Sequence, residues 1–309
     1  MAALQTATAI PSPALVDLPM QLCGPEPAVD VMVNGHGPLL FAIDTGATDD
    51  ARVDSPLLAR LNPRVTGSDR VSDGSASTRT VGTVRLDSLS IGGIEFHHVA
   101  ASTRDFNTLG LPHIDGMLTF DLFRDLLLTL NYPAQRVRLE RGALPALDGA
   151  GILRLKRVHG HPAVDLTIGK ERVTAEIDSG NVGEGFLFPG PLVGKLSLAT
   201  EPVDAGTART VTSVFALKAA QLRANIHLGA FELPQPRIVF PAPFPFANIG
   251  RRILYRFAVT FDQKHDRVRF VQNIGSRGSG PSASRSSRSG SVTTVHSLFM
   301  CSVARSAAV

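Results

Sequence analysis

The strongest constraint on the fold is an internal repeat: two halves of the chain carry the same landmarks in the same order. The first copy runs from Pro27-Ala28-Val29-Asp30 through an apolar stretch to Asp44-Thr45-Gly46. The second copy runs from Pro162-Ala163-Val164-Asp165 through another apolar stretch to Asp178-Ser179-Gly180. A unit duplicated at this length predicts two similarly folded lobes.

Later landmarks extend the repeat. Ile114-Asp115-Gly116 is matched to Asn248-Ile249-Gly250, because the Gly of each segment follows the Asp of its tripeptide by 72 residues. Each copy then ends in a pair of related strands, expected over 129–139 and 260–270. We therefore expect an N-terminal lobe over 25–141 and a C-terminal lobe over 152–273.

The remaining segments differ from the lobes in composition. Residues 1–24 contain several prolines and are expected to form a leader, and residues 142–151 are expected to form an interlobe linker. The segment 274–309 is rich in Ser, Arg and Gly, so it cannot bury enough apolar area to order itself. We expect a disordered tail there.

Within the lobes, short alternating runs separated by Gly and Asp predict β-strands. Helices are expected at 55–61, 119–125 and 191–196, and a further helix-like stretch follows Gly250. Two polar hairpins, predicted at 69–80 and 204–213, are placed to act as flaps over a site.

The two acidic tripeptides carry the chemistry. Two Asp carboxylates within hydrogen-bonding reach can share one proton and activate a water for peptide-bond hydrolysis. The hydroxyls of Thr45 and Ser179 are suited to bond backbone across an approximate twofold axis, and the glycines let backbone amides approach the carboxylates. A lone Asp-Thr-Gly is usually a turn, but two in a duplicated frame indicate a joint site.

The tripeptides after apolar strands, with the Gly-containing segments that follow, resemble the pepsin and retropepsin superfamily of aspartic proteases over roughly residues 15 to 272. The resemblance implies an all-β fold of two homologous pepsin/retropepsin-like β-barrel lobes with a central cleft and few short helices. It implies an aspartic endopeptidase with Asp44 and Asp178 as the catalytic dyad. The supporting loop residues would be Thr45, Gly46, Ala47, Ser179, Gly180 and Asn181.

The same resemblance implies an extended peptide or protein substrate and no metal or organic cofactor. It also favours a periplasmic or cell-envelope location for a chain with so few cysteines. Two unequal motifs in one chain favour a monomer with an intramolecular pseudo-dimer over pairing of identical lobes between chains.

Two departures from the family pattern leave an alternative open. Asn181 stands where the family usually has Thr, Ser or Ala, and Asp49 and Asp50 add negative charge after the first tripeptide. A non-catalytic peptide-binding protein that has kept the fold is therefore the rival hypothesis.

The sequence gives little support to other functional classes, namely nucleic-acid binding, membrane-spanning and metal-binding proteins. The formal net charge of +4 comes from four arginines in the tail, which leaves the rest of the chain neutral and gives no indication of nucleic-acid binding. No run of 18 apolar residues predicts a transmembrane helix. His159 and His161 have the spacing of two ligands on one strand face, but an exposed strand edge is favoured over a metal site.

Overall fold

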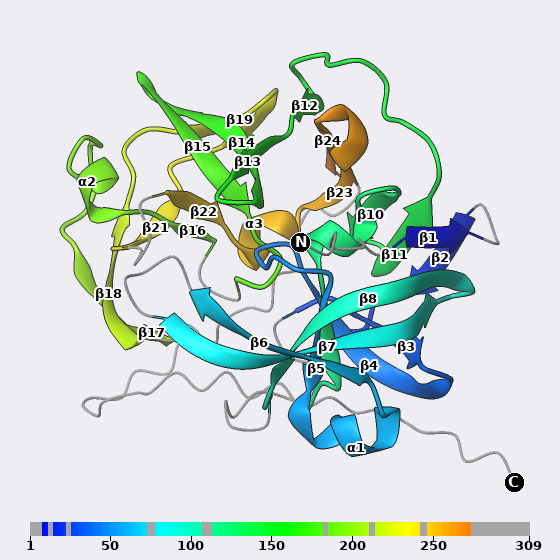
Figure 1. Ribbon diagram of the computed structural model, residues 1–309. Helices are drawn as coiled ribbons and strands as arrows, with labels where there is room; N and C mark the ends of the chain where they lie inside the picture. Colours follow the sequence, from blue (N-terminus) through cyan, green and yellow to red (C-terminus); the bar gives the residue numbers. More distant parts are fainter. Residues whose placement is uncertain are drawn as a thin grey trace, which may run out of the picture.

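The computed structural model describes residues 8–11, 15–22, 26–72, 78–106, 113–181, 185–209, 214–241 and 246–272. Its described part is mostly β-structure, as expected, with two lobes and a sheet to which both contribute (Figure 1). The expected tail and parts of the expected leader and flap tips lie outside the described residues.

The first lobe is an eight-stranded sheet in the order β1-β8-β5-β9-β4-β3-β7-β6, and an additional pairing of β7 with β8 closes it into a barrel. Figure 1 shows this lobe at the bottom, in blue and cyan. The strands are β1 (Thr8–Pro11), β3 (Ala28–Val33), β4 (His36–Asp44), β5 (Ala51–Asp54), β6 (Arg64–Ser72), β7 (Thr78–Ile91), β8 (Ile94–Arg104) and β9 (Gly116–Thr119).

The second lobe is a ten-stranded sheet in the order β17-β18-β21-β16-β22-β15-β14-β19-β20, with β13 paired to β14. The strands are β13 (Lys156–Val158), β14 (His161–Ile168), β15 (Glu171–Ile177), β16 (Phe186–Leu187), β17 (Val203–Arg209), β18 (Val214–Gln221), β19 (Ile226–Leu228), β20 (Phe231–Leu233), β21 (Arg237–Phe240) and β22 (Ala247–Ile249).

A six-stranded sheet, in the order β12-β24-β23-β10-β11-β2, draws strands from both halves of the chain. In its middle, β10 pairs antiparallel with β23, so that Thr129 faces Thr260 and their hydroxyls lie 2.9 Å apart. This pairing joins the two lobes through backbone hydrogen bonds. The strands are β2 (Leu15–Pro19), β10 (Leu127–Asn131), β11 (Arg136–Glu140), β12 (Ile152–Arg154), β23 (Phe257–Asp262) and β24 (Arg267–Gln272).

Helices are few and short, close to where the sequence predicts them. The N-terminal pair begins with a proline in its first turn and ends at Asn62, whose left-handed backbone closes the helix. The segments are η1 (Ser55–Leu57), α1 (Leu58–Leu61), η3 (Phe120–Phe123), α2 (Gly190–Val193), α3 (Arg251–Leu254) and η4 (Gln263–His265).

Alternation along β4 explains how the sheet of the first lobe serves both core and site. Phe41 and Ile43 are buried in the main core, whereas Ala42 belongs to a small separate apolar cluster with Ala47 and Met117. Because successive side chains point to opposite faces of a strand, Asp44 lies on the same face as Ala42. The catalytic candidate therefore ends a strand whose other face is anchored in the core.

Strand register corrects one landmark of the repeat. β4 runs parallel to β9 with Asp44 opposite Thr119, whereas β15 runs parallel to β22 with Ile177 opposite Ile249. Gly250, the residue after Ile249, therefore corresponds to Thr119, and the match to Gly116 was wrong. The first copy has three more residues in this interval, and the equal spacing to two different glycines concealed them.

Both predicted hairpins are present. The β6–β7 pairing runs to Ser72 opposite Thr78, and β17 pairs with β18 up to Arg209 opposite Val214. The region expected to be a leader contains two strands, since β1 pairs with β8 and β2 pairs with β11.

Candidate active site

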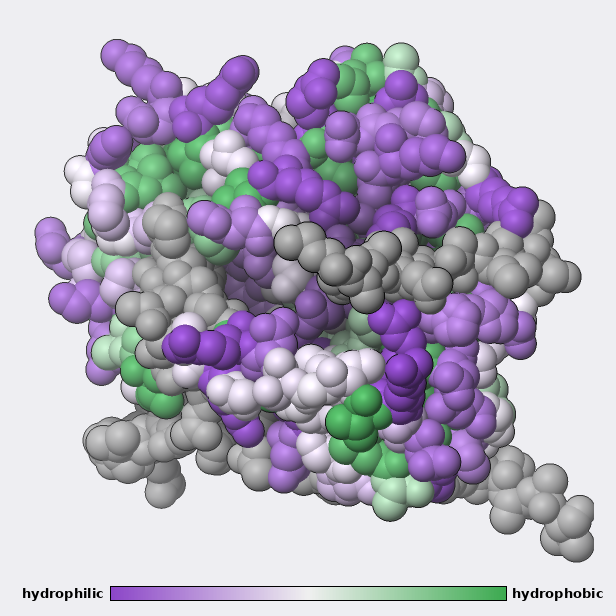
Figure 2. Space-filling view, viewed as in Figure 1, coloured by the Kyte–Doolittle hydropathy of each residue, from purple (hydrophilic) through white to green (hydrophobic). Residues whose placement is uncertain are grey.

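The two acidic tripeptides meet between the lobes. Asp44 is the last residue of β4, and Asp178 directly follows β15, so each carboxylate stands where a strand of its own lobe ends. Both aspartates are half-buried. Figure 2 shows the molecule hollowed between the lobes, with mainly hydrophilic residues on the visible walls.

Four hydrogen bonds cross between the loops. Thr45 Oγ1 donates to Ile177 O at 2.7 Å and accepts from Ser179 N at 3.0 Å. In the reverse direction, Ser179 Oγ donates to Ile43 O at 2.7 Å and accepts from Thr45 N at 2.9 Å. Both hydroxyl residues are fully buried. The bonding across the axis that the sequence indicated is thus present in both directions, and it fixes one loop against the other.

The glycines bring each loop against the opposite aspartate. A Cβ atom added to Gly46 would collide with the Asp178 carboxylate, and one added to Gly180 would collide with that of Asp44. No side chain larger than hydrogen fits either position without movement. The two carboxylates therefore lie side by side over the crossed loops, as a shared-proton pair requires.

The two carboxylates receive unequal numbers of hydrogen bonds. Gly46 N donates to Asp44 Oδ1 at 2.8 Å. Asp178 receives three: Gly180 N and Asn181 N donate to Oδ1 at 2.9 and 3.0 Å, and the Asn248 amide donates to Oδ2 at 2.8 Å. Burial and the nearby Asp44 raise the pKa of Asp178, while these three bonds act in the lowering direction.

Asn181, the unusual residue after the second tripeptide, leaves the carboxylate in place. Its side-chain amide donates to Asn248 Oδ1 at 2.6 Å, so Asn181 reaches Asp178 through Asn248. The amide of Asn248 also donates to Glu176 Oε2 at 3.2 Å. Asn248 is 1% exposed and Glu176 is 4% exposed.

Glu176 is a buried carboxyl close to the dyad. Burial first, and then the charges of Asp178 and Asp44, raise the pKa of Glu176 to about 10. Its Oε1 lies 3.2 Å from Nδ1 of His161, whose own pKa is lowered mainly by burial. Glu176 is thus kept neutral near pH 7 and adds no charge beside the dyad.

His161 does not lie where the sequence indicated. His159 and Gly160 form the turn between β13 and β14, both with positive φ, and His161 begins β14 facing Glu176. The two imidazoles do not share an exposed strand face, so that interpretation was wrong. Among the described residues, no group of three or more His, Cys, Asp or Glu side chains is placed to hold a metal ion.

Asp49 and Asp50, which follow the first tripeptide, lie in different environments. Asp50 is buried and forms an ion pair of 2.6 Å with Arg124. Asp49 is exposed on a left-handed backbone, and partial desolvation raises its pKa. The charge of Asp50 is therefore compensated within the first lobe.

A further carboxyl, that of Glu26, lies near the dyad in the first lobe. Glu26 occupies the place before Pro27-Ala28 that His161 occupies before Pro162-Ala163. Burial and the charges of Asp44 and Asp178 raise the pKa of Glu26, which Arg104 and Arg52 partly oppose. Sequence reasoning missed Glu26, although the repeat itself marks the position.

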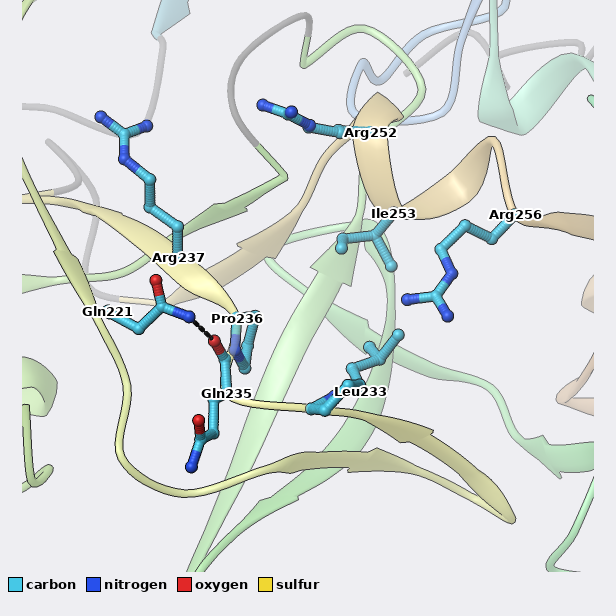
Figure 3. Close-up of a pocket in the computed structure, with 9 residues that line it drawn as sticks. Gln221, Leu233, Gln235, Pro236, Arg237, Arg252, Ile253 and Arg256 are labelled. Carbon is cyan, nitrogen blue, oxygen red and sulfur yellow. Dashed lines mark hydrogen bonds between the residues drawn. The ribbon is translucent and has the colours of Figure 1, made fainter. Parts of the chain in front are cut away.

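A second hollow lies elsewhere on the second lobe and includes none of the tripeptide residues. Figure 3 shows it between α3, which contributes Ile253, and the β20–β21 connection, with Arg256 directed toward Leu233. In the described part of the chain, no helix has the length and apolar character needed to cross a bilayer.

The fold and the paired loops have the arrangement of the pepsin/retropepsin-like superfamily. Residues 29–122, which run from β3 into η3 and include the Asp44 loop, match the family model described as aspartyl protease. The match supports a protease-like function and confirms the expected superfamily. No curated protein sequence matches the chain.

Proposed function

We propose that the chain is an aspartic endopeptidase in which Asp44 and Asp178 together activate a water molecule. The observation that carries the proposal is the contact of each glycine with the opposite aspartate, which requires the two carboxylates to be adjacent. The crossed hydroxyl bonds hold that arrangement rigidly. The aspartyl protease match over the first lobe supports it independently.

The chemistry follows from one shared proton. The ionised carboxylate removes a proton from water while the water oxygen bonds to the scissile carbonyl carbon, and the protonated partner donates to the carbonyl oxygen. The resulting tetrahedral diol collapses when the leaving nitrogen takes a proton and its bond to carbon breaks. Water is thereby divided between a new carboxyl group and a new amine.

The substrate is proposed to bind as an extended peptide. The β6–β7 and β17–β18 hairpins would offer main-chain groups to such a peptide from the two lobes. The shared β10–β23 pairing lets a single chain supply both aspartates, so we propose a monomer, which sedimentation analysis would check.

The test is cleavage of a mixed peptide library between pH 3 and 8 by the wild type, Asp44→Asn and Asp178→Asn. Loss of cleavage by at least roughly a thousandfold in each variant is expected, because neither carboxyl can work without its partner. Asp30→Asn, on the exposed face of β3, is the matched control and should cleave normally.

Persistent cleavage in either dyad variant would remove that aspartate from the mechanism. If the wild type cleaves nothing at any pH yet binds library peptides, the chain is a peptide-binding protein with a degenerate site.

A further inference from the structure

The strand registers show that the two lobes surround their aspartates differently. In the first lobe, Ala42 of β4 pairs with Met117 of β9. In the second lobe, the corresponding pair is Glu176 of β15 with Asn248 of β22. The apolar pair of the first lobe is thus replaced in the second lobe by a carboxyl and an amide, both of which are buried. Glu176 stands two residues before Asp178 on β15, and Asn248 lies beside it on the neighbouring strand β22.

Asn248 uses all of its side-chain hydrogen-bonding capacity except one acceptor site. Its Oδ1 accepts from Asn181, and the two N–H groups of Nδ2 go to Asp178 Oδ2 and Glu176 Oε2. With Asp178 ionised and the Glu176 proton on Oε1, turning the amide over would place its oxygen against two acceptor atoms and its NH2 against another NH2. Asn181 and Glu176 therefore fix the direction in which Asn248 donates.

Glu176 completes this arrangement as an acceptor without charge. Ionised, it would place an unpaired negative charge in the interior beside two aspartates, which burial disfavours. Neutral, it accepts from Asn248, and its Oε1 lies 3.2 Å from His161 Nδ1, which forms no hydrogen bond among the described residues. A glutamine would keep the acceptor for Asn248.

We propose that Asn248, oriented by Glu176 and Asn181, is a positioning residue that holds the Asp178 carboxylate through Oδ2 and makes its role distinct from that of Asp44. Asp44 has no such second donor from the corresponding residue, Met117. This inference rests on the proposed dyad. Asn248 would thus have a role in the second lobe beyond the pairing of β22 with β15.

The first experiment compares Asn248→Met with Met117→Leu. Asn248→Met gives the second lobe the side chain that the first lobe has, while Met117→Leu is an apolar exchange at the corresponding position. Loss of a hydrogen bond to a charged group predicts a kcat reduced roughly 10- to 100-fold in Asn248→Met, with KM changed less than about threefold. Met117→Leu should keep both constants within about threefold.

Two substitutions of Glu176, one conservative and one apolar, test its role. Glu176→Gln retains an acceptor for Asn248 and should keep kcat near the wild-type value, whereas Glu176→Leu should lower it as Asn248→Met does. Equal losses in Gln and Leu variants would overturn the role of Glu176. An unchanged kcat in Asn248→Met, or equal losses in Asn248→Met and Met117→Leu, would overturn the proposal itself.

A second readout separates this proposal from the proposed function. Carbon-13 titration of the Asp178 carboxyl should show a higher pKa in Asn248→Met, because the Asn248 bond favours the ionised form. Asp44, whose charge raises the pKa of Asp178, and the neighbouring ionisable groups Glu26, Glu176 and Tyr132 are unchanged in this comparison.

An unshifted titration would refute the positioning role even if peptides are cleaved. Absence of cleavage in the wild type, together with the shifted titration, would refute the peptidase proposal alone. Should Asn248→Met fail to fold, Asn248→Leu approximates the shape of the side chain, removes the two amide donors without adding a charge, and is subject to the same criteria.

Discussion

Replacing Glu176 by Gln should stabilise the protein at neutral pH and leave its stability unchanged in acid. The folded protein keeps a proton on Glu176 up to a pKa of about 10, whereas the unfolded chain releases it near the ordinary value of 4.5. For a raised carboxyl pKa, the stability contribution is complete below 4.5 and is lost as the pH rises toward the folded value. Gln cannot ionise and escapes that loss.

The magnitude follows from the same values. A pH of 7 is roughly 2.5 units above the pKa of the carboxyl in the unfolded chain. This difference sets an upper limit of about 3 kcal/mol on the gain in the free energy of unfolding. Because Glu176 is 4% exposed, solvent screening reduces this figure little. We expect a gain of about 1–3 kcal/mol at pH 7 and of less than about 0.5 kcal/mol at pH 4.

Urea unfolding of the wild type and Glu176→Gln at both pH values measures the difference, with exposed Glu201→Gln as the matched control. Equal stabilisation at pH 4 and pH 7 would show that the gain does not come from the proton. Destabilisation at pH 7 would show that Glu176 is ionised in the folded protein, and the reasoning would fail.

Two further predictions concern the crossed loops. Thr45→Val leaves the buried amide of Ser179 without its acceptor and should lower the free energy of unfolding by about 2–3 kcal/mol in urea titrations. The exposed control Thr80→Val should change it by less than about 0.5 kcal/mol. Similar values for both variants would show that the crossing hydrogen bonds do not stabilise the protein. Gly180→Ala should abolish peptide cleavage in a folded protein, because its methyl group would displace the Asp44 carboxylate, and normal turnover there would contradict the adjacency of the two carboxylates.

The sequence predicted those parts of the candidate site that occur in both copies of the repeat. Asp44 and Asp178, with their hydroxyl and glycine neighbours, could be found because both loops need the same small residues for the same contacts. The short helices were recognisable from local signals such as a proline in the first turn.

The rest depends on pairing between distant strands. Glu176 and Asn248 meet only because β15 and β22 lie side by side, and a single sequence does not show that register. The mismatch of Gly116 with Gly250 has the same origin, since spacing along the chain cannot distinguish an equivalent residue from one displaced by three positions. The location of His161 was missed because a two-residue turn places it on a strand.

The pairing of Thr129 with Thr260 in the shared sheet has a consequence for how the two lobes are joined. The two threonines hold matching places in the two copies, and antiparallel strands related by a twofold axis pair matching residues in this way. A half-chain alone would present the same strand as an open edge, onto which a second copy could pair in the same register. A single chain that contains both strands can give each aspartate its own surroundings, which identical subunits could not do.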